Sequence, residues 1–441
     1  MSDMASSESY WPSAAASPLF LAAGRVVQLL TAFPVPIFFI CLIAMLFRPP
    51  DLPLYSIDHA ALVLLVVSVV TRTLIVKKRL AISTLVALPL TFLVILSLSS
   101  ILFLPFQPEN WSVWLAKWVV PLSFYLIAGH IFENQEQLEH LESFLLVVLG
   151  YLVLLALLFL FDLKSLIFPH YILDESIGIH TERARGPFLQ AVANGMAINI
   201  LAILGIDSFR RGSLKGLSAI ILLAGVPLAI FATLTRAVWI CFAGSMAAVA
   251  FLFRDNRVRK AALWFAVIGI LGIFLFLTCS ASYCRFSERL EERSPVDFRI
   301  VMLQTGLQMF TERPWMGWNA ADVQPELADR VIDFHQPQYF FHNTYLEIAV
   351  YHGLIGLALY AWLIFDLFRV GSRRFMHPVE NSFLGDSFRR VWPVILAVYL
   401  VNANFVVMNY QFVNALLFSL AGLLAAHNRS QLLPGRPRPA G

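Results

Sequence analysis

A single histidine before a predicted helix start is the residue best placed for acid–base chemistry. His342 and Asn343 precede a segment in which Thr344 and Glu347 have capping-box spacing, so a helix is predicted to begin near residue 344. Free backbone N–H groups at a helix N-terminus favour anions and keep an adjacent imidazole neutral. Because a neutral imidazole can accept a proton, His342 is the candidate general base, with Asn343 in support. A structural role is the alternative.

Arginines near the ends of apolar stretches could bind a phosphate group. A guanidinium binds phosphate through two parallel hydrogen bonds and stays ionised at any working pH. The candidates are Arg185, Arg236 and Arg299, followed in rank by Arg289; Asn194 and Lys117 are candidate supporting residues. The alternative for each arginine is that its side chain only reaches from a helix end to the membrane interface.

No metal or cofactor is expected at such a site. The four cysteines match no metal-ligand spacing, and the loops predicted to face away from the cytoplasm hold no Asp-x-Asp pair. Cys41 and Cys241 lie inside apolar runs, where they are predicted to act as small hydrophobic residues. Cys279 and Cys284 flank the start of a long polar segment, and they could form a disulfide or remain free thiols.

The composition indicates that the elements which position these residues are membrane helices. Of 441 residues, 59% are hydrophobic and 14% charged, and the mean hydropathy is +0.73. Ordinary soluble chains carry about 25% charged residues. The net charge of +4 comes from 32 basic and 28 acidic residues, a balance that gives no indication of a nucleic-acid partner. The sequence therefore predicts an integral membrane protein.

Apolar stretches of spanning length predict an all-α polytopic protein with about twelve transmembrane helices. Their predicted ranges are 27–47, 56–76, 81–104, 111–131, 144–162, 188–208, 217–234, 237–253, 261–279, 344–368, 391–409 and 412–426.

Basic residues predict the orientation, because Lys and Arg are retained in cytoplasmic loops. With twelve spans, nineteen basic residues fall on one side and five in the short loops of the other. Both termini are therefore predicted to be cytoplasmic. The predicted organisation is a disordered tail at 1–24, a helical membrane domain at 25–426 and a second tail at 427–441.

The outward segment 280–342, between the ninth and tenth predicted spans, is long enough to fold. Ser294-Pro295-Val296-Asp297 predicts a helix start, and that helix is expected to end near Glu312. A turn at 314–319 and a second helix near 322–334 should follow. Such a loop could lie as a lid on the helices. His335, in the same loop, is the reserve base.

These motifs together resemble the O-antigen ligase and polymerase superfamily, and the likeness spans most of the chain. The order of the motifs along one predicted side carries the resemblance. They are Arg185-Gly186-Pro187 with Asn194, Thr235-Arg236-Ala237, Arg299, the turn with Pro314, Gly317 and Asn319, and Phe341-His342-Asn343-Thr344-Tyr345-Leu346.

The resemblance implies a glycosyltransferase with a GT-C-like bundle in the bacterial inner membrane and a periplasmic active site. Members move a glycan from undecaprenyl pyrophosphate to a hydroxyl. The expected function is O-antigen ligase in lipopolysaccharide biosynthesis, with lipid A-core as the acceptor, metal-independent and inverting, with His342 as base and arginines on the pyrophosphate. O-antigen polymerase and protein O-oligosaccharyltransferase are alternatives within the superfamily.

A transporter or flippase for lipid-linked sugars is the alternative of another class. It would place ionisable residues at the bilayer midplane on broken helices. Here the strongest ionisable candidates cluster toward the outward side, which favours an enzyme acting at one membrane face.

Overall fold

The computed structural model describes residues 32–48, 56–76, 83–102, 104–178, 181–253, 255–278, 294–332, 339–372 and 382–430. In these ranges the regular secondary structure is helical and contains no strand. The main helices are α2 (Pro34–Leu46), α3 (Ile57–Val76), α4 (Thr84–Ile101), α5 (Pro108–Trp114), the π-helix η2 (Leu115–Val119), α6 (Val120–Ile131), α7 (Gln135–Leu160), α8 (Ala191–Arg211), α9 (Gly216–Ala232), α10 (Arg236–Leu252), α11 (Asn256–Thr278), α13 (Ser294–Glu312), α14 (Ala320–Arg330), α15 (Thr344–Ser372), α16 (Asp386–Asn402) and α17 (Gln411–Ser430).

Every apolar stretch predicted from the sequence overlaps one of these helices, with α5, η2 and α6 forming one stretch. The all-helical polytopic class is therefore confirmed. Within the described ranges, six helical segments are long and apolar enough to cross a membrane, and α2, α9 and α10 are apolar but shorter. The count of twelve spans and the orientation of the termini remain predictions. The six segments are Ile57–Ile75, Thr84–Ile101, Pro108–Ile131, Gln135–Leu160, Ala191–Arg211 and Thr344–Ser372.

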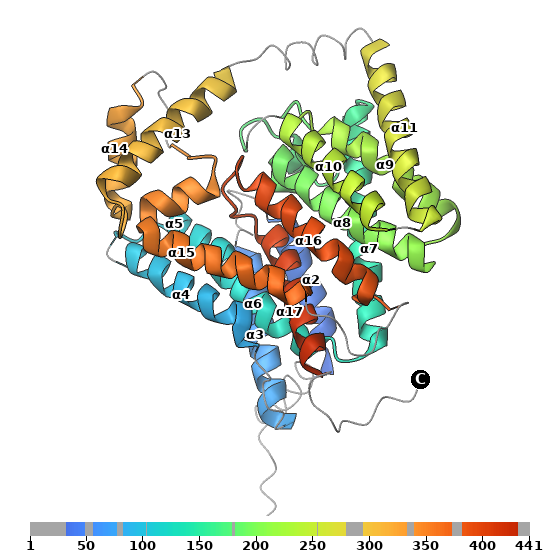
Figure 1. Cartoon of the computed structure of the whole chain (residues 1–441), viewed down its shortest axis with the longest axis horizontal. Helices are drawn as coiled ribbons and strands as arrows, with labels where there is room; N and C mark the ends of the chain where they lie inside the picture. The colour runs from blue at the N-terminus through green and yellow to red at the C-terminus, as the bar shows by residue number, and fades with distance from the viewer. Residues whose placement is uncertain are drawn as a thin grey trace, which may run out of the picture.

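The helices pack around α17, which contacts α6, α2, α15 and α8. Figure 1 shows α17 between a group that contains α4, α5 and α15 and a group that contains α7 to α11. Small residues let α17 approach α6 closely: a Cβ on Gly422 would lie 2.2 Å from the Tyr125 carbonyl oxygen, and one on Gly129 would lie 2.7 Å from the Ala426 Cβ. Such close contact is how membrane helices associate where lipid removes the hydrophobic driving force.

Helix α7 begins at Gln135, nine residues before the predicted span start at 144. The Asn134 carboxamide oxygen accepts the Gln137 backbone N–H at 2.9 Å, and the Gln137 side chain accepts the Asn134 N–H in return. Because of this capping box, the helix begins in the polar segment that precedes its apolar part. The polar first turns thereby bring Glu142 to a buried position.

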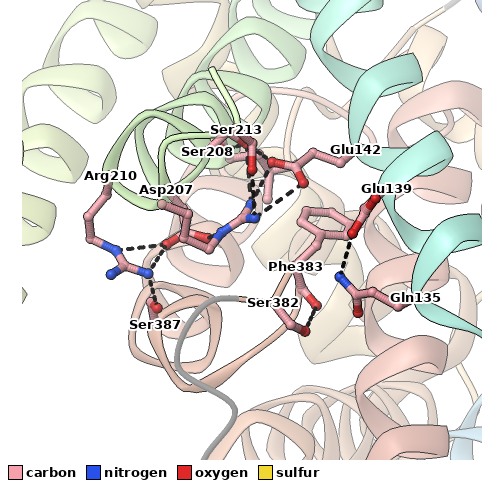
Figure 2. Close-up of polar contacts among 12 residues, drawn as sticks. Gln135, Glu139, Glu142, Asp207, Ser208, Arg210, Ser213, Ser382, Phe383 and Ser387 are labelled. Carbon is pink, nitrogen blue, oxygen red and sulfur yellow. Dashed lines mark hydrogen bonds and ion pairs between the residues drawn. The ribbon is translucent and has the colours of Figure 1, made fainter. Parts of the chain in front are cut away.

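A buried charge network joins α7 to α8 at this end of the bundle (Figure 2). Arg211 pairs with Glu142 at 2.6 Å and with Asp207 at 2.9 Å, and all three side chains are at most 5% exposed. Arg210 pairs with Asp207 at 3.2 Å and donates to Ser387 at the start of α16. The sequence predicts that these ends of α7 and α8 are cytoplasmic. Ion pairs between buried side chains thus hold them together.

The loop helices follow the sequence closely. Helix α13 covers the predicted range, and α14 begins at Ala320, two residues before the predicted start. The Arg313 guanidinium lies 4.1 Å from the centre of the Trp318 ring, and that of Arg330 lies 5.3 Å from it. Arg330 also binds both carboxylate oxygens of Glu312, which lowers the pKa of Glu312. These arginines therefore hold the loop helices together.

Helix α15 is broken at Gly353, and this break is not evident from the sequence. Gly353 has φ 59° and ψ −155°, and Gly317, in the turn between α13 and α14, has φ 77°. The turn inserts into the break: the Trp318 N–H donates to the Val350 carbonyl at 2.7 Å, and the Leu354 N–H donates to the Pro314 carbonyl at 2.7 Å. The polar loop is thereby joined to a membrane helix by backbone hydrogen bonds.

Helix α15 begins where the sequence predicts, but the predicted capping residue is wrong. Asn343 caps the helix, since its side-chain oxygen accepts the backbone N–H groups of Tyr345 and Leu346 at 2.9 and 3.0 Å. The Thr344 hydroxyl instead donates to the Val406 carbonyl and accepts the Met408 N–H, which ties the helix start to the α16–α17 connection. Tertiary partners outcompete the local pattern because they bury the hydroxyl with both of its hydrogen bonds made.

Several predicted features lie outside the described residues. These are the first tail, the second tail beyond Ser430, Arg289, His335, and the pair Cys279 and Cys284. Within the described part, α17 continues to Ser430, past the predicted domain end at 426. Cys41 and Cys241 are buried free thiols, as predicted.

Substitution Arg211→Met should lower the free energy of unfolding by about 3–5 kcal/mol, because Glu142 and Asp207 stay buried without this cation. The matched control is Arg72→Met. Arg72 faces Glu133 at 3.7 Å with both side chains about a third exposed, so the change should cost less than about 1 kcal/mol. Thermal unfolding in one detergent compares the two variants, and equal effects would contradict the assignment.

Substitution Gly353→Ala should destabilise the protein by more than about 1 kcal/mol, because an L-residue is strained at this φ. The added Cβ would also lie 2.4 Å from the Trp315 carbonyl oxygen. Limited proteolysis should then cut the segment 294–332 faster than in the unmodified protein. Gly150→Ala, in α7 where no heavy atom lies within 4 Å of a Cβ, should leave both the unfolding midpoint and the proteolysis rate unchanged.

Candidate active site

His342 lies directly before the cap of α15, in a backbone conformation with φ 50°. Such strain in a non-glycine residue is found more often at functional sites. The imidazole is half-buried, and its ring centre lies 6.0 Å from that of Phe298 on α13 and 6.3 Å from that of Phe340. The helix start fixes the position of His342, and the loop helix α13 covers it.

The turn of α13 beside this histidine carries an arginine. Arg299 follows Phe298 on α13, so the Phe298 contact brings this turn of α13 next to His342. Desolvation by its neighbours and the positive charge of Arg183 both lower the pKa of Arg299. Arg183 itself pairs with Glu182 at 3.3 Å. Positive charge at this place favours an anionic ligand.

Backbone contacts bring the segment of Arg183 alongside the connection that precedes α10. The Ala184 N–H donates to the Ala232 carbonyl at 3.0 Å, and the Asn194 side chain donates to the Ala184 carbonyl at 2.9 Å. Asn194 is fully buried, and its hydrogen bond stabilises this turn. Arg236, the first residue of α10, is exposed four residues after Ala232.

Arg185 differs from the other candidates because its guanidinium is occupied by its own loop. Its Nε, Nη1 and Nη2 donate to the carbonyls of Ile172, Ile177 and Asp174 at 2.8, 2.6 and 2.5 Å, and the residue is fully buried. This geometry favours a role in shaping the loop that carries Arg183 over direct contact with a ligand.

Lys117 lies in η2 and pairs with Glu347 of α15 at 2.5 Å. The two side chains are 9% and 16% exposed. The capping-box pattern implied that the Glu347 side chain caps α15. The side chain instead faces another helical segment. A buried ion pair at a π-helix is an unusual arrangement, and π-helices are frequently found at functional sites.

A comparison with protein-family models matches one segment of the chain. Residues 217–361 match the family model described as O-antigen ligase, a segment of about a third of the chain that contains Arg236, Arg299 and His342. This segment therefore belongs to the O-antigen ligase superfamily. No curated protein matches the sequence. Together with the apolar helices, the match of this segment indicates a multi-pass protein of the inner membrane.

Two charged residues of this region were not predicted from the sequence as site candidates. Arg183 counted only as a basic residue of an outward loop, although its position two residues before Arg185 was a usable signal. Glu347 was assigned to helix capping, and its pairing with Lys117 joins positions 230 residues apart.

The contrast between Arg185 and Arg183 can be measured. Arg185→Gln should lower the free energy of unfolding by more than about 2 kcal/mol, because three buried carbonyls lose their charged donor. Arg183→Gln removes a partly exposed side chain and should cost less than about 1 kcal/mol. Thermal unfolding of the two variants in the same detergent distinguishes them, and a larger loss from Arg183→Gln would contradict the structural role of Arg185.

Proposed function

We propose that this protein is an O-antigen ligase that transfers a glycan from undecaprenyl pyrophosphate to a sugar hydroxyl of lipid A-core, at the periplasmic face of the inner membrane. One observation carries the proposal: His342 lies directly before the N-terminus of α15 and beside the turn of α13 that carries Arg299, and both residues fall inside the segment that matches the O-antigen ligase family.

Arg183 and Arg299 would bind the pyrophosphate of the donor, and Arg236 would approach it from the start of α10. As the bond between the anomeric carbon and the phosphate oxygen breaks, negative charge grows on that oxygen. Guanidinium groups placed there in advance stabilise this charge more in the transition state than in the bound donor. Arg185 and Asn194 act as positioning residues for the loop.

His342 would take the proton of the acceptor hydroxyl while the hydroxyl oxygen bonds to the anomeric carbon. The leaving undecaprenyl pyrophosphate carries away the electron pair of the broken bond, so charges and atoms balance. Attack opposite the leaving group inverts the anomeric configuration. The N-terminus of α15 supports this role because the positive end of the helix favours the neutral imidazole, the form that can accept a proton.

The test is transfer by purified protein in detergent, with undecaprenyl-linked glycan and lipid A-core, without nucleotide and with EDTA present. A glycan–lipid A-core product supports the ligase. Chain growth on the carrier itself would identify a polymerase, and modification of a serine on an added protein would identify a protein O-oligosaccharyltransferase. Donor moved across vesicles without any transfer would identify a transporter.

Substitution His342→Ala should reduce kcat by about 10²- to 10⁴-fold, the range for loss of a general base. Arg299→Lys should reduce kcat/KM for the donor by more than tenfold, since an ammonium cannot form the two parallel hydrogen bonds. Arg257→Lys, at the exposed opposite end of the bundle, is the matched control and should be neutral. Full activity of His342→Ala would rule out the base assignment.

A further inference from the structure

A cleft of about 450 Å³ opens between α5, η2, α14 and the first turns of α15, and the pair Lys117 and Glu347 lies in its wall. We define it as the outer cleft by the residues that its argument uses: Trp114, Lys117, Gln324, Phe340, Glu347 and Tyr351. It lies next to the candidate active site, because Phe340 forms part of its wall and lies 6.3 Å from the His342 ring.

The charged groups of the outer cleft are balanced. Among its described lining residues, Lys117 is the one lysine or arginine and Glu347 the one carboxylate, and the two pair with each other at 2.5 Å. A phosphate group would meet no excess positive charge here, in contrast to the pair Arg183 and Arg299. The charge pattern therefore favours an uncharged, hydroxyl-rich ligand over a phosphate.

The walls combine aromatic rings with amides. Trp114, Phe340 and Tyr351 offer ring surfaces, and Phe340 is 48% exposed despite its size. The Gln324 side chain binds both the N–H and the carbonyl of Tyr339 at 3.0 Å, which fixes this wall of α14. Sugars present apolar C–H faces that stack on aromatic rings and hydroxyls that bond to amides and carboxylates. Concave sites of this size and mixed lining are typical of small-ligand binding.

We propose that the outer cleft binds the terminal sugars of the acceptor and thereby places the acceptor hydroxyl at His342. Phe340 stacks on a sugar ring, and Glu347, held by Lys117, accepts hydrogen bonds from sugar hydroxyls. This inference rests on the proposed function, since it assigns the acceptor to a cleft separate from the arginines that would hold the donor.

The rare π-helix gives the pair its geometry. A π turn widens the helix and shifts Lys117 relative to an ordinary α-helical register. The Ala116 carbonyl in this segment accepts a hydrogen bond from the Asn414 side chain of α17 at 2.8 Å, so this backbone carbonyl is satisfied within the bundle. Lys117 thus reaches α15 from a turn that the bundle core stabilises.

Binding and kinetics test the inference separately from the proposed function. Isothermal titration calorimetry measures binding of lipid-free core oligosaccharide to the purified protein. Phe340→Ala and Glu347→Gln should each weaken binding by about 3- to 10-fold, as for loss of one stacking contact or one charged hydrogen bond. In transfer assays the same variants should raise KM for the acceptor by a similar factor and leave KM for the donor unchanged.

Matched controls come from the neighbouring outward segment. Phe106→Ala removes an aromatic ring that is 76% exposed, and Glu109→Gln removes an exposed carboxylate; neither residue lines the cleft. Both should bind the oligosaccharide like the unmodified protein. Because Phe340 is exposed, its substitution keeps the test valid even if Glu347→Gln fails to fold.

The outcomes are distinct. Transfer with unchanged oligosaccharide binding and unchanged acceptor KM in Phe340→Ala would overturn the inference and leave the ligase proposal intact. A raised donor KM in place of the acceptor KM would assign the cleft to the donor glycan and also overturn it. Oligosaccharide binding that these variants weaken, without any transfer, would support the cleft and refute the proposed function.

Discussion

The outer half of the protein depends on one backbone junction, the insertion of the turn 314–318 into the break of α15. A helix break inside a membrane leaves amide and carbonyl groups that lipid cannot satisfy. Here Val350 and Leu354 make those hydrogen bonds with the turn. The close approach requires the positive φ of Gly317 and Gly353. Because the junction is made of backbone, it fixes the loop helices to the membrane helices with little freedom.

The junction also fixes the part of α15 on which both proposed binding regions depend. The short helical part before Gly353 carries His342 at its start and Glu347 one turn further on. Helix α13 covers the histidine and brings Arg299 to one side of it, whereas η2 brings Lys117 to the carboxylate. The same few turns therefore border a positively charged region and a neutral, aromatic one.

Arginine has three roles in this chain, and its partners decide which. Arg211 is buried against two carboxylates, so it holds helices together. Arg185 is buried against three carbonyls, so it shapes a loop. Arg299 is exposed on α13, and the positive charge of Arg183 lowers its pKa, so its surroundings favour an anionic ligand. Position at a helix end, the feature visible in the sequence, does not separate these cases.

The sequence by itself determined where the helices lie, because hydropathy, capping residues and prolines act within a few residues of one another. It predicted α13 with its observed bounds and placed His342 at a helix start. Only the tertiary structure decided the break at Gly353, the pairing of Lys117 with Glu347 and the approach of Arg183 to Arg299. Each joins segments far apart in the chain, whose contact depends on how the whole bundle packs.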